Sequence, residues 1–363
     1  MTYTGQPSSY YPSFRLYYPG GKAGSFGTLA AGFRNAFEVL GIKHALCDYR
    51  DTPDEDGFGR AGSGYDIGLY LGEPSHLSAI ALNTAHKERL VMVAPNGLGI
   101  PWFVVKDCKG FGCDIVTPSQ WGADVIEKAT GKRPEVIQHG VYLPSGMTEE
   151  EIEADDKRRL ASSEQAMEGR RKVKLLHVTS TATDRKGTIT LLRVFAADLW
   201  QTCHLTIKTD PEAGRHIKAR VDALDRMARE CVHVDTSNYP NDGAMFRFYR
   251  EHDLVVQPSA AEGFGMPSLE GACAGVPSLM SFVTGHVEFC ESISAWHWEH
   301  SREPGFLAGE DFDGYPPLES ADDALFAISR LWSLTGRANQ WRVATAKAWS
   351  WPAVVEKWLK ERI

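Results

Sequence analysis

The sequence has few of the features that are typical of secreted proteins, membrane-spanning proteins or proteins stabilised by structural metal ions. Its seven cysteines are scattered over 363 residues and none form a C-x-x-C pair. This argues against a disulfide framework or a zinc site and favours reduced thiols in a cytoplasmic protein. No stretch reaches the roughly 18 apolar residues of a membrane span. The first residues, MTYTGQPSSYYPSF, lack a basic region followed by an apolar run, so we expect no signal peptide.

An excess of basic residues is also missing. The 47 acidic residues outnumber the 39 lysines and arginines, which gives a formal net charge of −8. A protein that coats nucleic acid is therefore disfavoured, although a local basic groove is not excluded. The 12 histidines include no H-E-x-x-H motif. The D-E-D at 54–56 and the D-F-D at 311–313 lie in polar loops and follow no clear strand. We therefore expect no metal site.

Short apolar runs alternate with helical patterns, which is typical of parallel sheets covered by helices on both faces. The alternation extends over residues 1–150 and starts again over 173–345, whereas residues 151–172 are highly charged and predict a connection with some helix. The sequence therefore predicts an α/β protein with two Rossmann-like, doubly wound domains. The expected strands include FRLYY (14–18), RLVMVAP (89–95), CDIVTPS (113–119), VKLLHVTS (173–180), CHLTIKT (203–209), DLVVQPS (253–259) and VPSLMSF (276–282).

Two acids, Glu262 and Glu270, stand in the glycine-rich stretch AAEGFGMPSLEGACAGVP (260–277). Glycines there allow positive φ and a close approach of the backbone to a ligand. The helix predicted after them offers free N–H groups and a partial positive charge, which suit a phosphate. An acid inside its first turns can accept hydrogen bonds from ribose hydroxyls. The alternative is a glycine-rich turn with a solvated acid.

This stretch resembles the E-x7-E signature of retaining glycosyltransferases with the GT-B fold, particularly glycosyltransferase family four. Four further segments are similar to parts of that family: CDIVTPSQWGADVIEKATGKRPEVIQHGVY (113–142), TATDRKGTITLLRVF (181–195), NDGAMFRFYREHDLVVQPS (241–259) and WSWPAVVEKW (349–358). The resemblance implies two Rossmann-like domains that face each other across a cleft. Residues 1–150 would bind the acceptor, and residues 173–345 would bind a nucleotide sugar. Residues 346–363 would form a helix that crosses back to the first domain.

The resemblance also implies roles for the matching residues. Glu270 would hold the nucleotide ribose, and Glu262 would contact hydroxyls of the donor sugar. Lys186, with Arg185 beside it, would neutralise the diphosphate leaving group, since fixed cations stabilise charge that develops in a transition state. The alternative for this pair is a solvated basic turn. The turn that would lie against sugar and phosphate comprises Gly263, Phe264, Gly265 and Met266.

The sequence departs from the family pattern at two places. The family usually has an arginine six residues before the lysine, where this chain has Ser180; Arg185 or Lys208 would supply the second cation. Many members carry a histidine after the fourth strand, where this chain reads VMVAPNGLGIPW; Asn96 or backbone groups would replace it. His139 would contact the donor or serve as a hydrogen-bonded structural residue.

The loop GGKAGSFG (20–27) follows the first expected strand and is not a G-x-G-x-x-G fingerprint. In the resembling family this loop approaches the donor diphosphate and the acceptor, so Gly21, Lys22 and Gly24 are candidates for that contact. A plain turn is the alternative.

The expected function is transfer of a sugar from a nucleotide-diphosphate sugar to an acceptor hydroxyl with retention of configuration. A UDP-sugar is favoured over a GDP-sugar, and no metal or other cofactor is expected. The acceptor would be a glycan, a small molecule or a modified DNA base. A GT-B nucleotide-sugar epimerase and a non-catalytic sugar-nucleotide-binding protein are the alternatives.

Overall fold

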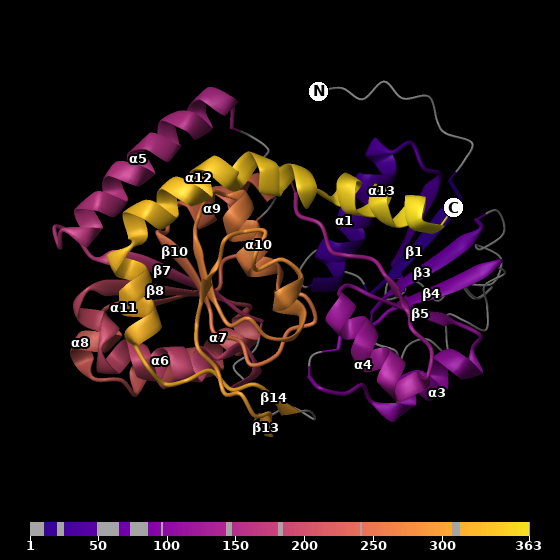
Figure 1. Cartoon of the computed structure of the whole chain (residues 1–363), viewed down its shortest axis with the longest axis horizontal. Helices are drawn as coiled ribbons and strands as arrows, with labels where there is room; N and C mark the ends of the chain where they lie inside the picture. Colours follow the sequence, from indigo (N-terminus) through magenta and orange to yellow (C-terminus); the bar gives the residue numbers. More distant parts are fainter. Residues whose placement is uncertain are drawn as a thin grey trace. The chain divides into compact units, whose positions relative to one another are not determined.

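The computed structural model describes residues 11–19, 25–48, 65–72, 86–95, 97–142, 147–180, 184–239, 242–306 and 313–362. The chain divides into two compact units. Unit 1 is Met1–Val141 with Ala348–Ile363, and unit 2 is Tyr142–Lys347. Each unit contains a six-stranded sheet in which every paired neighbour is parallel, with helices packed around it (Figure 1). The predicted α/β class with two doubly wound sheets is confirmed.

Unit 1 has the strand order β2-β1-β3-β4-β5-β6. Its central strands β1 and β3 are largely buried, as expected for a parallel sheet covered on both faces. The strands are β1 (Phe14–Tyr18), β2 (His44–Asp48), β3 (Ile67–Leu71), β4 (Glu88–Met92), β5 (Asp114–Thr117) and β6 (Glu135–Val136). The helices are α1 (Ser25–Val39), α3 (Trp102–Gly110), α4 (Gln120–Thr130) and, from the far end of the sequence, α13 (Trp351–Arg362).

Helix α13 packs against α1 and against Phe14 of strand β1 (Figure 1). The rings of Phe33 and Trp351 lie 5.1 Å apart, and those of Phe14 and Trp358 lie 5.7 Å apart. Gly32 makes this possible, because a Cβ there would overlap the indole of Trp351. Residues 348–363 therefore belong to unit 1, and the aromatic side chains of WSWPAVVEKW are what attach them.

Unit 2 has the strand order β12-β11-β10-β7-β8-β9. The strands are β7 (Val173–Val178), β8 (Cys203–Lys208), β9 (Val232–Asp235), β10 (Leu254–Gln257), β11 (Ser278–Met280) and β12 (Trp296–His297). The helices are α5 (Glu149–Met167), α6 (Thr188–Ala197), α7 (Pro211–Asp222), α8 (Arg226–Arg229), α9 (Asp242–Arg250), α10 (Met266–Cys273), α11 (Asp322–Ser329) and α12 (Leu331–Ala348). A short hairpin joins β13 (Gly305–Phe306) to β14 (Asp313–Gly314).

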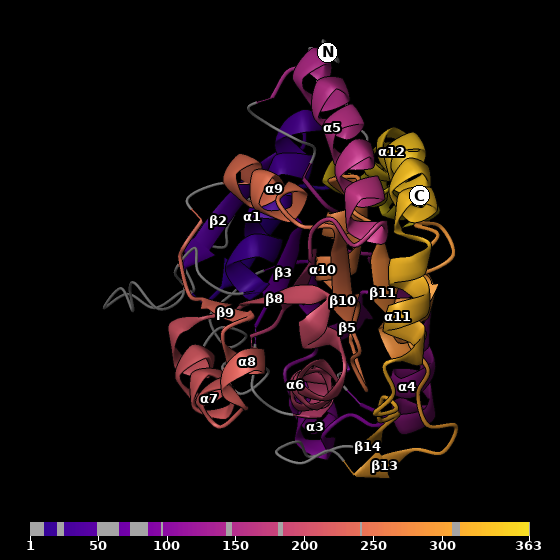
Figure 2. The same ribbon diagram turned by 90° about the vertical axis from the view of Figure 1, so that its left-hand side faces the viewer.

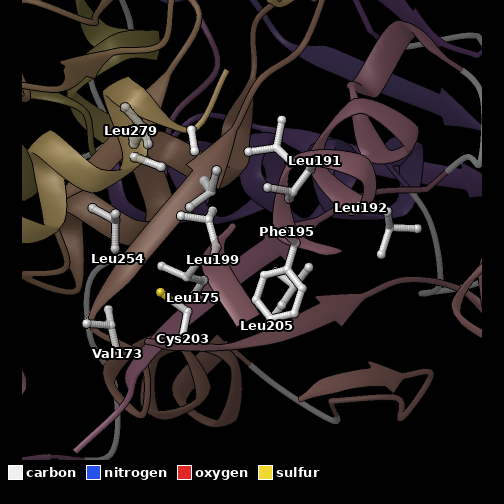
Figure 3. Packing of buried hydrophobic residues seen from close by; sticks show 14 of the residues in the cluster. Val173, Leu175, Leu191, Leu192, Phe195, Leu199, Cys203, Leu205, Leu254 and Leu279 are labelled. Carbon is white, nitrogen blue, oxygen red and sulfur yellow. The ribbon is translucent and has the colours of Figure 1, made fainter. Parts of the chain in front are cut away.

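The core of unit 2 lies between its sheet and helix α6. Leucines of the central strands β7, β8 and β10 meet Leu191 and Phe195 of α6 (Figure 3). Leu175, Leu205 and Leu254 of these strands are 0% exposed, as are Leu191 and Phe195. This packing fixes the strands whose carboxyl ends carry the candidate site described below.

The segment 151–172, predicted as a charged connection, is mostly helix α5 and belongs to unit 2. Helices α5 and α12 lie side by side (Figure 2). Three charged residues of α5, Asp155, Asp156 and Arg159, make contacts inside the unit, whereas most of the others are exposed. Arg159 donates to the carbonyls of Arg250 and His252 at 2.7 and 3.1 Å, and Arg250 bonds Asp155 and Asp156 at 2.5 and 2.6 Å. The charge pattern was misleading because charges that pair inside a fold look in sequence like charges that face water.

Replacing Arg159 with methionine is expected to lower the free energy of unfolding by about 2–4 kcal/mol. The change leaves buried carbonyls on the α9–β10 turn without their charged donor. Urea denaturation measures the loss as a lower midpoint with an unchanged slope. The matched control is Arg158→Met on the same helix, whose ion pair to Asp155 is exposed and is worth at most about 1 kcal/mol. Equal losses in the two variants would contradict this account.

Candidate functional site

The candidate site lies at the carboxyl edge of the unit 2 sheet. Three neighbouring strands, β11, β10 and β7, end there, and parallel α/β sheets bind ligands at this edge. The segments that follow these strands build the site. They are η2 (Asp184–Lys186) after β7, the turn 258–265 that leads from β10 into α10, and η4 (Thr284–Glu288) after β11.

Backbone hydrogen bonds tie these three segments together. The N–H of Ala260 donates to the carbonyl of Arg185 at 2.8 Å, and the N–H of Gly285 donates to the carbonyl of Glu262 at 2.8 Å. Gly187 is the residue before α6 and has φ of +66°. Its Cα lies close to the carbonyl oxygen of Pro258, and a Cβ at this position would overlap that oxygen. The turn 258–265 is therefore held from both sides by backbone.

Glu262 is buried in this turn and paired with Lys186. The Nζ of Lys186 donates to both carboxylate oxygens at 2.6 Å, and the hydroxyl of Ser259 donates to Oε1 at 2.8 Å. A guanidinium nitrogen of Arg185 lies 3.7 Å from Oε2. Burial would raise the pKa of Glu262, but Lys186 and Arg185 outweigh it and lower the pKa to about 2. The structure thus brings three predicted residues into one ionised cluster.

Thr284 holds the backbone of Glu262 in place. Its Oγ1 accepts a hydrogen bond from the N–H of Glu262 at 2.7 Å. Thr284 has φ of +49°, a left-handed conformation that a β-branched residue rarely adopts. Strain of this kind costs on the order of 1–3 kcal/mol and persists only where surrounding contacts enforce it. The sequence prediction missed Thr284, although its position just after a predicted strand at the same sheet edge was a usable signal.

The turn after Glu262 leads directly into the N-terminus of α10. Gly265 is the residue before that helix, with φ of +95°. Phe264 is buried against Phe289, with ring centroids 5.2 Å apart. Met266 is the first residue of α10. The turn therefore presents backbone, not large side chains, in front of a helix start, as an anion site requires.

Glu270 lies in the second turn of α10 and is partly buried. The hydroxyl of Tyr249, on α9, donates to its Oε2 at 2.6 Å. Burial first, and the Glu270 charge next, raise the pKa of Tyr249 well above its ordinary value. Tyr249 therefore stays protonated and holds one oxygen of the carboxylate. This partner was also missed by sequence reasoning.

Two buried histidines flank the cluster and were not predicted. His177, on β7, lies 2.9 Å from the carbonyl of Val256 through Nδ1 and 2.9 Å from the hydroxyl of Thr188 through Nε2. A carbonyl can only accept, so Nδ1 carries the proton and Nε2 accepts from Thr188. His286, on η4, places Nδ1 2.8 Å from the carbonyl of Ser281. Burial lowers the pKa of both rings.

Ser180 and Lys208 make no hydrogen bond or ion pair with the ionised cluster among the described residues. Ser180 is exposed just beyond the end of β7. Lys208, at the end of β8, donates to the carbonyl of Thr209 at 3.1 Å and lies over the ring of Tyr239. The hydroxyl of Tyr239 donates to Asp235 at 2.6 Å. Lys208 thus belongs to a second polar group at the ends of β8 and β9.

The remaining candidates are in unit 1. His139 is buried in unit 1 beside Trp351, with ring centroids 6.1 Å apart, and burial lowers its pKa to about 3. It is therefore neutral. Gly21, Lys22, Gly24 and Asn96 lie outside the described residues.

The described part of the chain has neither a cluster of metal ligands nor a helix able to span a membrane. No three histidine, cysteine, aspartate or glutamate side chains there gather as a metal ion would need. None of the helices in the described ranges combines the length and the apolar character needed to cross a membrane. The D-E-D at 54–56 and the first two residues of the D-F-D at 311–313 lie outside these ranges.

Comparison with known proteins identifies a family. The sequence model described as "Family 4 Glycosyltransferase in conflict systems" matches residues 133–356, which is more than half of the chain. The matched range contains η2, the turn 258–265 and α10, and so includes the ionised cluster. None of the proteins with curated descriptions matches the sequence.

Several solved structures are similar to this chain in fold. HepE of Anabaena, in complex with UDP and glucose, superposes with a TM-score of 0.64 at 12% identity, over 97% of this chain and 99% of that one. A glycosyltransferase of Rickettsia africae gives 0.62 at 15% identity, over 97% of each chain. Sucrose-phosphate synthase of Thermosynechococcus elongatus gives 0.64 at 14% identity, over 97% and 98%. The predicted GT-B fold is thereby confirmed.

Proposed function

Because the chain belongs to the family-4 glycosyltransferases of conflict systems, we propose that it moves a sugar from a nucleotide-diphosphate sugar to an acceptor hydroxyl with retention of configuration. The observation that carries this proposal is the buried Lys186–Glu262 pair in front of the α10 N-terminus. A cation and a helix start meet there, and together they match the charge of a diphosphate leaving group.

The Lys186–Glu262 pair would exchange partners when the donor binds. In the free protein each group neutralises the other. With donor bound, the Nζ of Lys186 would turn to the diphosphate and the carboxylate of Glu262 would accept from sugar hydroxyls. Arg185 and the N–H groups of α10 would supply the remaining positive charge, so we propose that no metal is needed. Glu270, with one oxygen held by Tyr249, would accept from the ribose.

Retention fits a front-face transfer better than a covalent intermediate. In the proposed complex the carboxylate of Glu262 keeps the hydrogen bond from Ser259 and accepts from sugar hydroxyls, so both of its oxygens have partners other than C1. In the proposed step the bond from sugar C1 to the phosphate oxygen breaks and a bond from C1 to the acceptor oxygen forms on the same face. The proton of the acceptor hydroxyl passes to the leaving phosphate.

UDP-glucose is the proposed donor, because the similar HepE structures contain UDP, glucose and UDP-glucose. Unit 1 is proposed to bind the acceptor, a glycan or small molecule, in keeping with the acidic net charge. A hydroxylated DNA base would instead give binding that weakens steeply with salt. All seven cysteines are free thiols, which supports a cytoplasmic setting.

The test is a thermal-shift screen with UDP-sugars and GDP-sugars. A ligand that binds only the folded protein raises its Tm, by an amount that grows with concentration over Kd. UDP-glucose is expected to give the largest shift, and Glu270→Ala is expected to need at least tenfold more nucleotide for the same shift. Absence of any shift with either nucleotide class would overturn the proposal.

Product analysis separates the alternatives after the donor is known. Transfer with a retained anomeric linkage, unaffected by a chelator, is the expected result. Turnover of donor to an isomeric nucleotide sugar without acceptor would identify an epimerase. Binding without hydrolysis or transfer would identify a non-catalytic binding protein. An inverted linkage would refute the front-face step.

A further inference from the structure

His286 is a buried polar side chain with one unused nitrogen. It is 1% exposed, and Nδ1 donates to the carbonyl of Ser281 at 2.8 Å, so the neutral ring keeps a lone pair on Nε2. Among the described residues Nε2 has no hydrogen-bond partner. His177, buried in the same unit, uses both nitrogens. An unsatisfied buried acceptor costs about 1–3 kcal/mol, so its presence calls for a reason.

Nε2 of His286 is directed at the start of α10. A Cβ on Gly265, the residue before that helix, would overlap Cδ2 and Nε2 of the imidazole. The turn 258–265, which would bind the donor, is therefore in direct contact with the Cδ2–Nε2 edge of the His286 ring. A lone pair would repel an anion at the helix start, whereas an N–H at the same atom would attract it.

The charges that face His286 come from two other segments. Glu262, in the turn after β10, favours the protonated ring, and Lys186, in η2, opposes it. The ring also meets the carbonyl of Ser281, the residue after β11, and the edge of Phe289, the residue after η4. In the free protein these two charges act in opposite directions, and burial, the largest influence, holds the pKa of the ring below its ordinary value.

We propose that binding of the donor diphosphate is coupled to uptake of one proton from solvent at Nε2 of His286. This inference rests on the proposed function. The donor brings negative charge to the α10 start and draws Lys186 away from Glu262, so both changes favour a cation at His286. The protonated ring then adds a buried positive charge beside the diphosphate, where the exposed Ser180 provides none. His286 acts through charge and through the Gly265 turn, as a positioning residue.

The coupling has a definite sign. Burial lowers the pKa of His286 in the free protein below its ordinary value of 6.5, and the bound donor raises it. Between the two values the complex holds one proton more than the free protein. Affinity therefore falls as pH rises through this window, by up to roughly tenfold per pH unit. Below the window the ring is protonated in both states, and the affinity is constant.

Isothermal titration calorimetry with UDP-glucose tests the coupling. The diester diphosphate of this donor has no ionisation of its own in the range used. The apparent enthalpy is measured in buffers of different ionisation enthalpy between pH 6 and 8.5, and its slope counts the protons taken up. The wild-type protein is expected to take up between about half and one proton, with Kd rising with pH.

The matched variant is His286→Asn. Its amide N–H can still donate to the carbonyl of Ser281, but the position of Nε2 is lost. For this variant, the Kd for UDP-glucose and the number of protons taken up on binding are expected to be independent of pH. Its Kd at pH 7 is expected to be about tenfold higher than that of the wild-type protein. His286→Gln, which fills the space near Nε2 without a titrating group, should behave likewise. The control His216→Asn, on the exposed face of α7, should keep the wild-type uptake.

The outcomes separate this inference from the proposed function. UDP-glucose that binds with no proton uptake in the wild-type protein overturns the inference and leaves the donor site intact. Equal uptake in wild type and His286→Asn assigns the proton elsewhere and also overturns it. No binding of any nucleotide sugar would overturn the proposed function itself. Because proton uptake is measured first on the wild-type protein, the inference can be overturned even if no variant folds.

Discussion

Lys186→Ala is expected to reduce kcat for sugar transfer by about 10²–10³-fold, the usual cost of removing one preorganised group that stabilises transition-state charge. In the free protein Lys186 is bonded to both oxygens of Glu262, and in the proposed transition state it faces the leaving diphosphate. Steady-state kinetics with UDP-glucose and the identified acceptor measures the effect. We expect the loss to appear mainly in kcat, because the charge develops as the bond breaks.

The Lys186 experiment needs a control for folding. Removing the lysine leaves a buried carboxylate without its main partner, which by itself costs about 3–5 kcal/mol unless the acid takes up a proton. The double variant Lys186→Met with Glu262→Gln removes both charges and should fold with near-wild-type Tm while staying inactive. Lys218→Ala, on the exposed face of α7, should be unchanged. A folded double variant with wild-type kcat would refute the role of the pair.

Gly187→Ala is expected to be the most destabilising single methyl addition in unit 2. At φ of +66° an alanine costs about 1–2 kcal/mol, and its Cβ would also overlap the carbonyl oxygen of Pro258. Because that oxygen belongs to backbone held at the carboxyl end of β10, it cannot turn aside as a side chain would. We expect a total loss of about 4 kcal/mol or more in the free energy of unfolding.

Gly169→Ala separates the two contributions. Gly169 has nearly the same φ, +70°, in the same unit, but a Cβ there meets no atom within 4 Å among the described residues. It should lose only the conformational cost of about 1–2 kcal/mol. Urea denaturation of both variants gives the difference directly. Similar losses would show that the backbone around Pro258 can move, and that η2 and the turn 258–265 are less tightly held than their geometry indicates.

The fold was largely predictable because its signals are local. VKLLHVTS and DLVVQPS are short apolar runs followed by turn residues, and both lie in strands of the unit 2 sheet, β7 and β10. The segment 151–172 was harder. Its acids and arginines find partners about 90 residues away, such as Arg250 with Asp155, and a run of charges in sequence does not reveal such partners.

The site was predictable in part for the same reason. The E-x7-E spacing and the Lys-Gly element are each contained in one short segment, so the resemblance could place Glu262 and Lys186. Their direct pairing depends on the order of the strands, which brings residues 76 positions apart together. Thr284 and His286 were missed because they follow a third strand. The predicted strand 276–282 put both of them at the right edge of the sheet, but only the strand order, with β11 next to β10, makes them neighbours of the turn.

The attachment of α13 to α1 has a consequence for biosynthesis. Unit 2 is one continuous segment of the chain, whereas unit 1 is assembled from two segments that are translated on either side of it. Domains generally fold as units while the chain emerges from the ribosome. Here the first segment of unit 1 emerges before the segment that carries Trp351 and Trp358. The apolar face of α1 that packs on α13 therefore stays exposed in the nascent chain until unit 2 has been synthesised. Chaperones would therefore act on the beginning of this chain for longer than on its middle.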